Sequence, residues 1–299
     1  MQRFKNILIN LSLRDEEASV LQWSGAVARL GESENITALH TWDPIDIPDE
    51  LRARYPWLLE PGQEASSKRM DSLLAEHLQV PSATAVNRII KQGSSLGEVL
   101  TIAETGKVDL VVCGRSDDDV YLSERLARKA PCSVLSVPPS APSKFHRVLV
   151  PIDFSSFSTQ ALEIAIAFAF SAGADLTLMH AFKVPRGEAK AVTTRPEIVT
   201  EFAEIHEARL NKLIASMDTR GVKISTQVVA SSSTPAAVND VVEAGNHDLV
   251  IIGCRGRHAI YATLLGSTAE AILHGCPVPV VAVKSKTAGR DILAALRNN

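Results

Sequence analysis

The most informative part of the chain is a short glycine-rich stretch, because its residue types and spacing could bind a ligand. It follows the apolar run 249–252. Two residues separate its first glycine from the second, and nine separate the second from the third, which a serine and a threonine follow: Gly253, Gly256, Gly266, Ser267 and Thr268. Glycine has no Cβ, so neighbouring backbone amides can approach a ligand closely. A helix that begins near Ser267 adds unpaired N–H groups and a partial positive charge. The pattern predicts a cradle for phosphate, and the alternative is an ordinary loop whose glycines only make turns.

The bulk composition limits the class of protein. The 299 residues are too many for one typical domain of about 100–150 residues, so we expect two domains. The net charge of −3 and the absence of a dense basic patch exclude nucleic acid as an expected partner. No run reaches the roughly 18 apolar residues that cross a bilayer, and the N-terminus does not read as a signal peptide. We therefore expect a cytoplasmic protein that does not enter the membrane.

The four cysteines form no CxxC pair and no cluster with histidine, so no metal site is expected. We expect them to be reduced and to act as small apolar side chains. Cys254 lies inside the glycine-rich stretch, and a reactive thiol there is the alternative. No trio of serine, histidine and aspartate has a spacing that compels a catalytic triad, so no catalytic residue is assigned.

The chain contains two copies of one pattern. Four segments recur in the same order at an offset near 140, which widens only after the glycines: 4–12 with 145–153, 36–40 with 176–180, 108–114 with 247–253, and 131–137 with 277–283. A proline-rich stretch, 138–143, joins the copies. We therefore expect tandem domains over 1–139 (the first half) and 145–299 (the second half).

Each half alternates short apolar runs with helical patterns. In the second half we expect helices near 157–172, 196–219, 234–245 and 267–275, with His206 and Glu207 on a solvated face of the long one. We expect strands near 147–152, 175–180, 223–229, 248–252 and 279–283. Short apolar runs suit strands that are buried on both faces of a parallel sheet. The predicted fold class is α/β, with an open doubly wound five-stranded parallel sheet of order 3-2-1-4-5 in each half, flanked by helices.

That strand order places the two most informative features of the second half together. Asp153 follows the first strand and Gly253 follows the fourth. Ligands of doubly wound folds bind outside the carboxyl ends of the strands, where the winding direction reverses. We therefore expect a binding crevice between Asp153 and Gly253.

These motifs resemble those of the universal stress protein family. The resemblance rests on the sequence VLVPIDFS at 148–155, on His180, on the Gly-x2-Gly-x9-Gly-Ser-Thr stretch and on the final CPVPVVAV at 276–283. It implies a Rossmann-like domain of five parallel strands in each half. It also implies binding of an adenine nucleotide, usually ATP, in members that keep the glycine-rich stretch. The two halves are expected to pack on each other as separate chains do in single-domain members.

The resemblance also assigns roles to particular residues. Pro151, Ile152 and Asp153 would line the adenine and ribose side, and Ala181 would contact the adenine. The phosphates and ribose would be held by Gly253, Gly256, Gly266, Ser267 and Thr268. A carboxylate can accept a hydrogen bond from a ribose hydroxyl, although capping of the following helix is the alternative role for Asp153. We expect His180 to be an internally satisfied histidine, because His40 has the same place in the first half.

The first half departs from the nucleotide-binding pattern. Ser12 replaces the aspartate, and Asn10 replaces the proline of the second half. After Gly114 roughly seven residues are missing, and the aspartates at 117–119 stand where phosphate would lie. Clustered carboxylates repel phosphate. We therefore expect this half to lack the nucleotide site.

The leading functional hypothesis is a stress-response or signalling protein whose second half holds ATP or another adenine nucleotide, with or without Mg²⁺, and with little or no turnover. One alternative is a slow ATPase or phosphoryl-transfer enzyme, for which Asp153 is the only metal ligand that we can name. The other is an interaction protein that binds no nucleotide and forms a homodimer. Its basis is the last strand of each half, 131–137 and 277–283, which would lie at a sheet edge unless the halves pair with each other.

Overall fold

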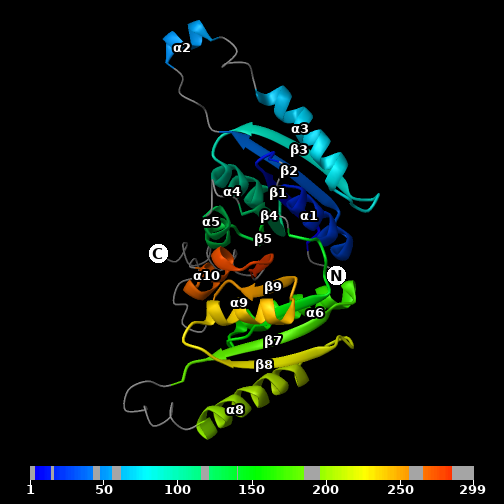
Figure 1. The fold of residues 1–299 in the computed structure, drawn as a ribbon. Coiled ribbons are helices and arrows are strands. Elements are labelled where there is room, and N and C mark those ends of the chain that lie inside the picture. Colours follow the sequence, from blue (N-terminus) through cyan, green and yellow to red (C-terminus); the bar gives the residue numbers. More distant parts are fainter. Residues whose placement is uncertain are drawn as a thin grey trace, which may run out of the picture.

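The computed structural model describes residues 4–14, 17–42, 48–55, 62–115, 121–139, 141–184, 196–255 and 265–284. These residues form one ten-stranded sheet that is covered by helices (Figure 1). Each half contributes five parallel strands in the order 3-2-1-4-5. The predicted fold class is therefore confirmed.

The elements alternate along the chain as expected. The first half contains β1 (Asn6–Leu11), α1 (Ala18–Gly31), β2 (Asn35–Trp42), α2 (Asp49–Arg54), α3 (Gly62–His77), β3 (Ala85–Gln92), α4 (Ser95–Thr105), β4 (Leu110–Gly114), α5 (Leu122–Lys129) and β5 (Ser133–Val137). The second half contains β6 (Arg147–Pro151), α6 (Ser156–Ala172), β7 (Asp175–Phe182), α8 (Pro196–Ala215), β8 (Ile224–Ala230), α9 (Thr234–Gly245), β9 (Leu249–Gly253), α10 (Ser267–Gly275) and β10 (Val280–Val283).

The two five-stranded units join through their last strands. β10 pairs antiparallel with β5, with Val281 opposite Leu135. Every other strand pair in the described sheet is parallel. β5 and β10 therefore lie in the middle of the sheet, and its two edges are β3 and β8.

Helices cover both faces of the sheet, as apolar strands that are buried on both sides require. α1, α3, α6 and α8 pack over one core, and α4, α5, α9 and α10 pack over the other (Figure 1). Each core contains buried side chains from both halves. No helix among the described residues is long and apolar enough to cross a membrane.

Aromatic side chains join the two halves within the first of these cores. Trp23 of α1 packs edge-on against Phe145, with 4.5 Å between ring centroids. Phe4 lies 5.8 Å from Phe168 of α6. Phe4 and Phe145 hold corresponding positions just before β1 and β6, so each half presents the same aromatic residue to a helix of the other.

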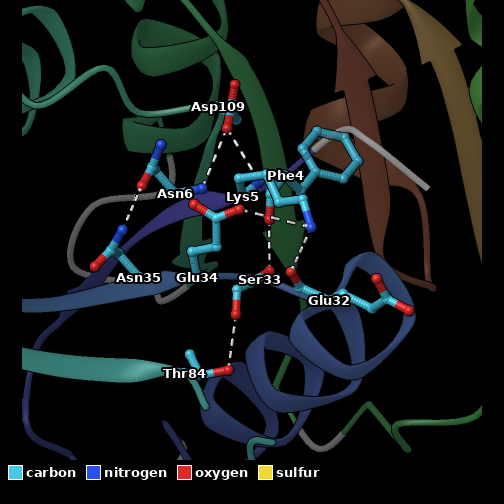
Figure 2. Close-up of polar contacts among 9 residues, drawn as sticks. All are labelled: Phe4, Lys5, Asn6, Glu32, Ser33, Glu34, Asn35, Thr84 and Asp109. Carbon is cyan, nitrogen blue, oxygen red and sulfur yellow. Dashed lines mark hydrogen bonds and ion pairs between the residues drawn. The ribbon is translucent and has the colours of Figure 1, made fainter.

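The duplication extends to polar contacts at the amino ends of the strands. The carboxylate of Asp109 accepts the N–H groups of Lys5 and Asn6, and that of Asp248 accepts those of His146 and Arg147. Figure 2 shows the Asp109 contacts beside the bonds that tie the starts of β1, β2 and β3 together. There the Ser33 hydroxyl donates to the Phe4 carbonyl, and the Thr84 hydroxyl donates to the Ser33 carbonyl. These contacts lie at the amino ends of the strands, opposite the carboxyl ends where doubly wound folds hold their ligands.

Candidate functional site

The carboxyl ends of β6 and β9 meet where the winding of the second half reverses. β6 pairs with β9 through Val148 and Leu249 on one side and with β7 on the other. Asp153 follows β6, and Gly253 ends β9. The two features that the sequence singled out therefore follow neighbouring strands, at the position where doubly wound folds hold their ligands.

Asp153 takes part in the turn that starts α6. Its Oδ1 accepts hydrogen bonds from the Ser155 N–H at 3.0 Å and from the Ser155 hydroxyl at 2.6 Å. Ser155 is the N-cap of α6, and its side chain accepts the Ser158 N–H. The capping alternative thus applies to Ser155, which Asp153 orients. Phe154 between them has φ of 62°, a costly conformation for a bulky residue.

The remaining residues expected on the adenine side lie at the ends of β6 and β7. Pro151 and Ala181 are half-buried, whereas Ile152 is buried and donates its N–H to the Met179 carbonyl at 2.7 Å. The Nδ1 atom of His180 lies 2.6 Å from the Ile152 carbonyl oxygen. His40 makes the same contact with the Leu11 carbonyl in the first half, which confirms that these are internally satisfied histidines.

Gly253 has a packing role that the sequence pattern did not reveal. A Cβ atom at this position would lie 2.7 Å from the backbone carbonyl carbon of Phe157 in α6. Only glycine allows β9 and α6 to approach so closely. Arg255 lies over the Phe157 ring, 5.4 Å from its centroid. Gly256 lies outside the described residues.

The amino end of α10 presents backbone amides without a side-chain cap. Its N-cap is Gly266, whose N–H donates to the Cys254 carbonyl at 2.9 Å and so closes the two ends of the loop together. The first helical bond is donated by Glu270, so the preceding amides have no partner within the helix. Ser267 and Thr268 in this turn are exposed. By contrast, α4, α6 and α9 each begin at a capping serine.

Cys254 does not have the surroundings of a reactive thiol. Its side chain is buried, and burial raises the pKa of the thiol to about 11, against smaller opposing effects of Lys284 and Arg255. A thiol in such a place is inert, because the thiolate is the reactive form. The described part of the chain contains no group of three or more histidine, cysteine or acidic side chains that could hold a metal ion.

Sequence patterns did not predict a cluster of aromatic rings at the ends of β6 and β7. The rings of His180 and His206 lie 4.5 Å apart, and Phe154 packs 4.7 Å from His180. Phe182 lies 5.3 Å from His206. The expectation that His206 belongs to a solvated face was wrong, because α8 turns this residue towards the end of β7. The signal in the sequence was the spacing of Phe202 and His206, four residues apart on one helical face.

An acidic side chain lines the corresponding crevice of the first half, together with Ser12 and Gly114. Glu17 accepts hydrogen bonds from the Ser12 N–H at 2.8 Å, the Ser12 hydroxyl at 2.9 Å and the Leu13 N–H at 3.3 Å. Its side chain is buried, and burial raises the pKa of Glu17 despite these bonds. A carboxylate therefore takes the amide donors beside the end of β1. The aspartates at 117–119 lie outside the described residues.

The first half also contains one Gly-x-Ser-x-Gly sequence, at 93–97, between β3 and α4. This spacing is that of the nucleophile elbow of α/β-hydrolases, in which the serine has a strained backbone. In this protein the φ angle of Ser95 is not positive, and its hydroxyl lies 2.6 Å from that of Thr41. Ser94 caps α4 by accepting the Gly97 N–H. The segment serves as a helix start.

Comparisons with known proteins agree with this architecture. The model of the universal stress protein family matches residues 3–138 and again 144–284. Universal stress protein Rv2005c of Mycobacterium tuberculosis is 27% identical over 255 residues, which cover 82% of this chain and 83% of that protein. Universal stress protein A homolog 2 of Coxiella burnetii is 28% identical over 145 residues, 48% of this chain and 97% of its own length.

A solved structure of a universal stress protein from Archaeoglobus fulgidus has the same fold over most of both chains. It superimposes with a TM-score of 0.61 at 20% identity and covers 94% of this chain and 97% of its own. Since the family model matches twice and nearly throughout, the chain belongs to the universal stress protein family, as a tandem of two family domains.

Proposed function

We propose that this protein binds one adenine nucleotide, such as ATP, in the crevice of the second half and uses it as a ligand with little or no turnover. Membership of the universal stress protein family supports a general role in the stress response. The nucleotide would select a conformation or a partner, which is the action expected of a binding module that lacks a hydrolytic clamp.

The observation that carries the proposal is the uncapped amino end of α10 beside the ends of β6 and β9. Amides without helical partners and the positive end of the helix dipole attract an anion of phosphate size. Gly266 leaves these amides accessible, and the exposed hydroxyls of Ser267 and Thr268 can donate to phosphate oxygens.

The proposed contacts divide between the two sides of the crevice. Base and ribose would meet Pro151, Ile152, Asp153 and Ala181, and the phosphates would meet Gly253, Gly256, Gly266, Ser267 and Thr268. Asp153 would accept a ribose hydroxyl while still orienting Ser155, because a carboxylate offers about four acceptor positions. Any Mg²⁺ would be bound to the phosphates of the nucleotide.

The first half, proposed to span 1–139, would bind no nucleotide in this way, and the second, 145–299, would bind it alone. Glu17 supports this division, because its carboxylate already accepts the amides of Ser12 and Leu13 and would repel phosphate.

Equilibrium dialysis with labelled ATP tests the proposal with one informative variant. Ser267→Glu places a carboxylate at the first position of α10. Its negative charge interacts favourably with the positive end of the helix dipole, so the variant is expected to fold. The same charge would repel phosphate, so we expect retention of ATP to fall at least about tenfold. Ala271→Glu adds an equal charge to an exposed position of the same helix and is expected to bind like the wild type. Negligible retention by the wild type, or equal retention by all three proteins, would reject the proposal.

A phosphate-release assay separates binding from turnover. Oδ1 of Asp153 already accepts two hydrogen bonds from Ser155, which favours a positioning role over that of a mobile base. We therefore expect no release of phosphate above background over hours with Mg²⁺. Release that is lost in Asp153→Asn would favour the slow ATPase instead.

The pairing of β5 with β10 also bears on the oligomeric state that we propose. β5 and β10 satisfy each other's ladder, so a second copy of the chain could not add there without separating the halves. We propose a single chain as the working unit, in the cytoplasm, where the four buried free cysteines would stay reduced. Sedimentation at several concentrations distinguishes this unit from a homodimer.

A further inference from the structure

The end of β4 in the first half makes a contact that reaches into the second half. Arg115 follows β4, at the place where a ligand of the first half would be expected. Its guanidinium instead donates to backbone carbonyls at the far end of α10. Nη1 lies 3.0 Å from the Leu273 oxygen and 3.2 Å from the His274 oxygen. Nη2 donates to the carbonyls of Cys276 and Val278.

This contact satisfies groups that a helix leaves open. The last carbonyls of a helix have no partner within it, and they form the negative end of its dipole. A guanidinium carries five N–H donors in a fixed fork and no acceptor, so one arginine can serve several carbonyls at once. Because Arg115 is half-buried, water cannot easily take its place at these carbonyls.

A side chain of the second half in turn contacts the carboxyl end of a helix in the first half. The Nζ atom of Lys284, just after β10, donates to the carbonyls of Arg128 and Ala130 at the end of α5. α5 and α10 are the corresponding last helices of the two halves. The two helices differ at their amino ends, because only α10 follows the complete glycine-rich stretch.

From these contacts we infer that Arg115 of the first half is a positioning residue for the nucleotide site proposed in the second half. It holds the carboxyl end of α10 and so sets the place of the amino end, where the phosphate would bind. The inference rests on the proposed function. It gives the first half a role in binding although Glu17 lines the crevice of that half and would repel phosphate.

The test compares full-length variants in two measurements: ATP retention in equilibrium dialysis, and amide hydrogen exchange of α10 without ligand. Arg115→Ala is expected to speed exchange across α10 about tenfold and to weaken ATP binding about tenfold, a typical size for coupling between sites. Arg115→Lys keeps the charge but not the fork, so partial rescue of both values is expected. If Arg115→Ala fails to fold, Arg115→Lys carries the test, with weakened ATP binding as the expected result.

Arg128→Ala is the matched control. It removes an exposed ion pair between the first half and the Glu270 side chain of the same helix, at 2.8 Å. An exposed pair contributes little, so both measurements should stay near the wild-type values. If the wild type retains ATP and the folded Arg115 variants retain it equally, the inference is overturned and the proposed function stands. A wild type that retains no ATP overturns both.

Discussion

Gly253 lies so close to Phe157 that a β-carbon at position 253 would be 2.7 Å from the Phe157 carbonyl carbon and 2.8 Å from its oxygen. Gly253 is also the first glycine of the stretch that marks the proposed phosphate site. The approach of β9 to α6 requires glycine at this position, and the proposed function gives the same residue a contact with phosphate. Stability measurements can separate these two roles.

Replacing Gly253 by alanine should destabilise the protein by about 1–3 kcal/mol, because the added methyl group meets backbone that cannot move aside easily. Urea unfolding measures this change. Gly275→Ala is the control, since a Cβ there would meet nothing within 4 Å and alanine favours a helix. If Gly253→Ala keeps wild-type stability but loses ATP, the glycine serves the ligand alone.

Trp23 is fully buried where the halves meet, so Trp23→Ala should cost about 3–5 kcal/mol of unfolding free energy. Because both cores contain residues of both halves, we expect one unfolding transition, shifted as a whole, by circular dichroism in urea. Phe170→Ala removes a ring that is 57% exposed and should change stability by less than about 1 kcal/mol. Two separate transitions, with only the first half destabilised, would contradict a shared core.

His247 should make stability fall in mild acid. Burial is the main reason that its pKa lies below the ordinary 6.5, and its ring contacts the Val241 carbonyl and the Thr177 hydroxyl, each at 3.0 Å. The unfolded chain therefore binds a proton more readily than the folded one. The stabilisation is complete above pH 6.5 and is lost as the pH falls through the folded pKa.

Urea unfolding between pH 5 and pH 8 checks the His247 prediction. Replacement by glutamine removes the titrating group, so the Gln variant should show a flatter dependence on pH than the wild type below pH 6.5. Parallel curves for the two proteins would show that another group is responsible.

The sequence predicted most of the second half because its signals are local. Apolar runs and turn residues placed β7 and β9 within two residues of their observed ends, and Ser233 marks the start of α9. The long helix α8 ends at Ala215 rather than near 219. There the chain turns, with Asp218 accepting the Arg220 N–H, a competition between side chain and helix that periodicity does not reveal.

Contacts between distant segments could not be predicted in the same way. Arg115 reads as one more polar residue after a strand, and its partners on α10 depend on which strand edges pair. Glu17 stands in the charged run at 14–17, which is typical of an exposed helix start, yet it is buried. A carboxylate can be buried where the preceding turn supplies amide donors to it. Here the turn contains Leu13, whose φ is 64°, and the N–H groups of Ser12 and Leu13 donate to Glu17.

The most direct test of the nucleotide site is amide hydrogen exchange of the whole chain with and without saturating ATP. If phosphate binds at the amino end of α10, the amides of Ser267, Thr268 and Ala269 should exchange several-fold more slowly with ATP, and those around Ser12 should not change. Saturation with ATP that leaves the first turn of α10 unaltered, or that protects the first half instead, would contradict the account.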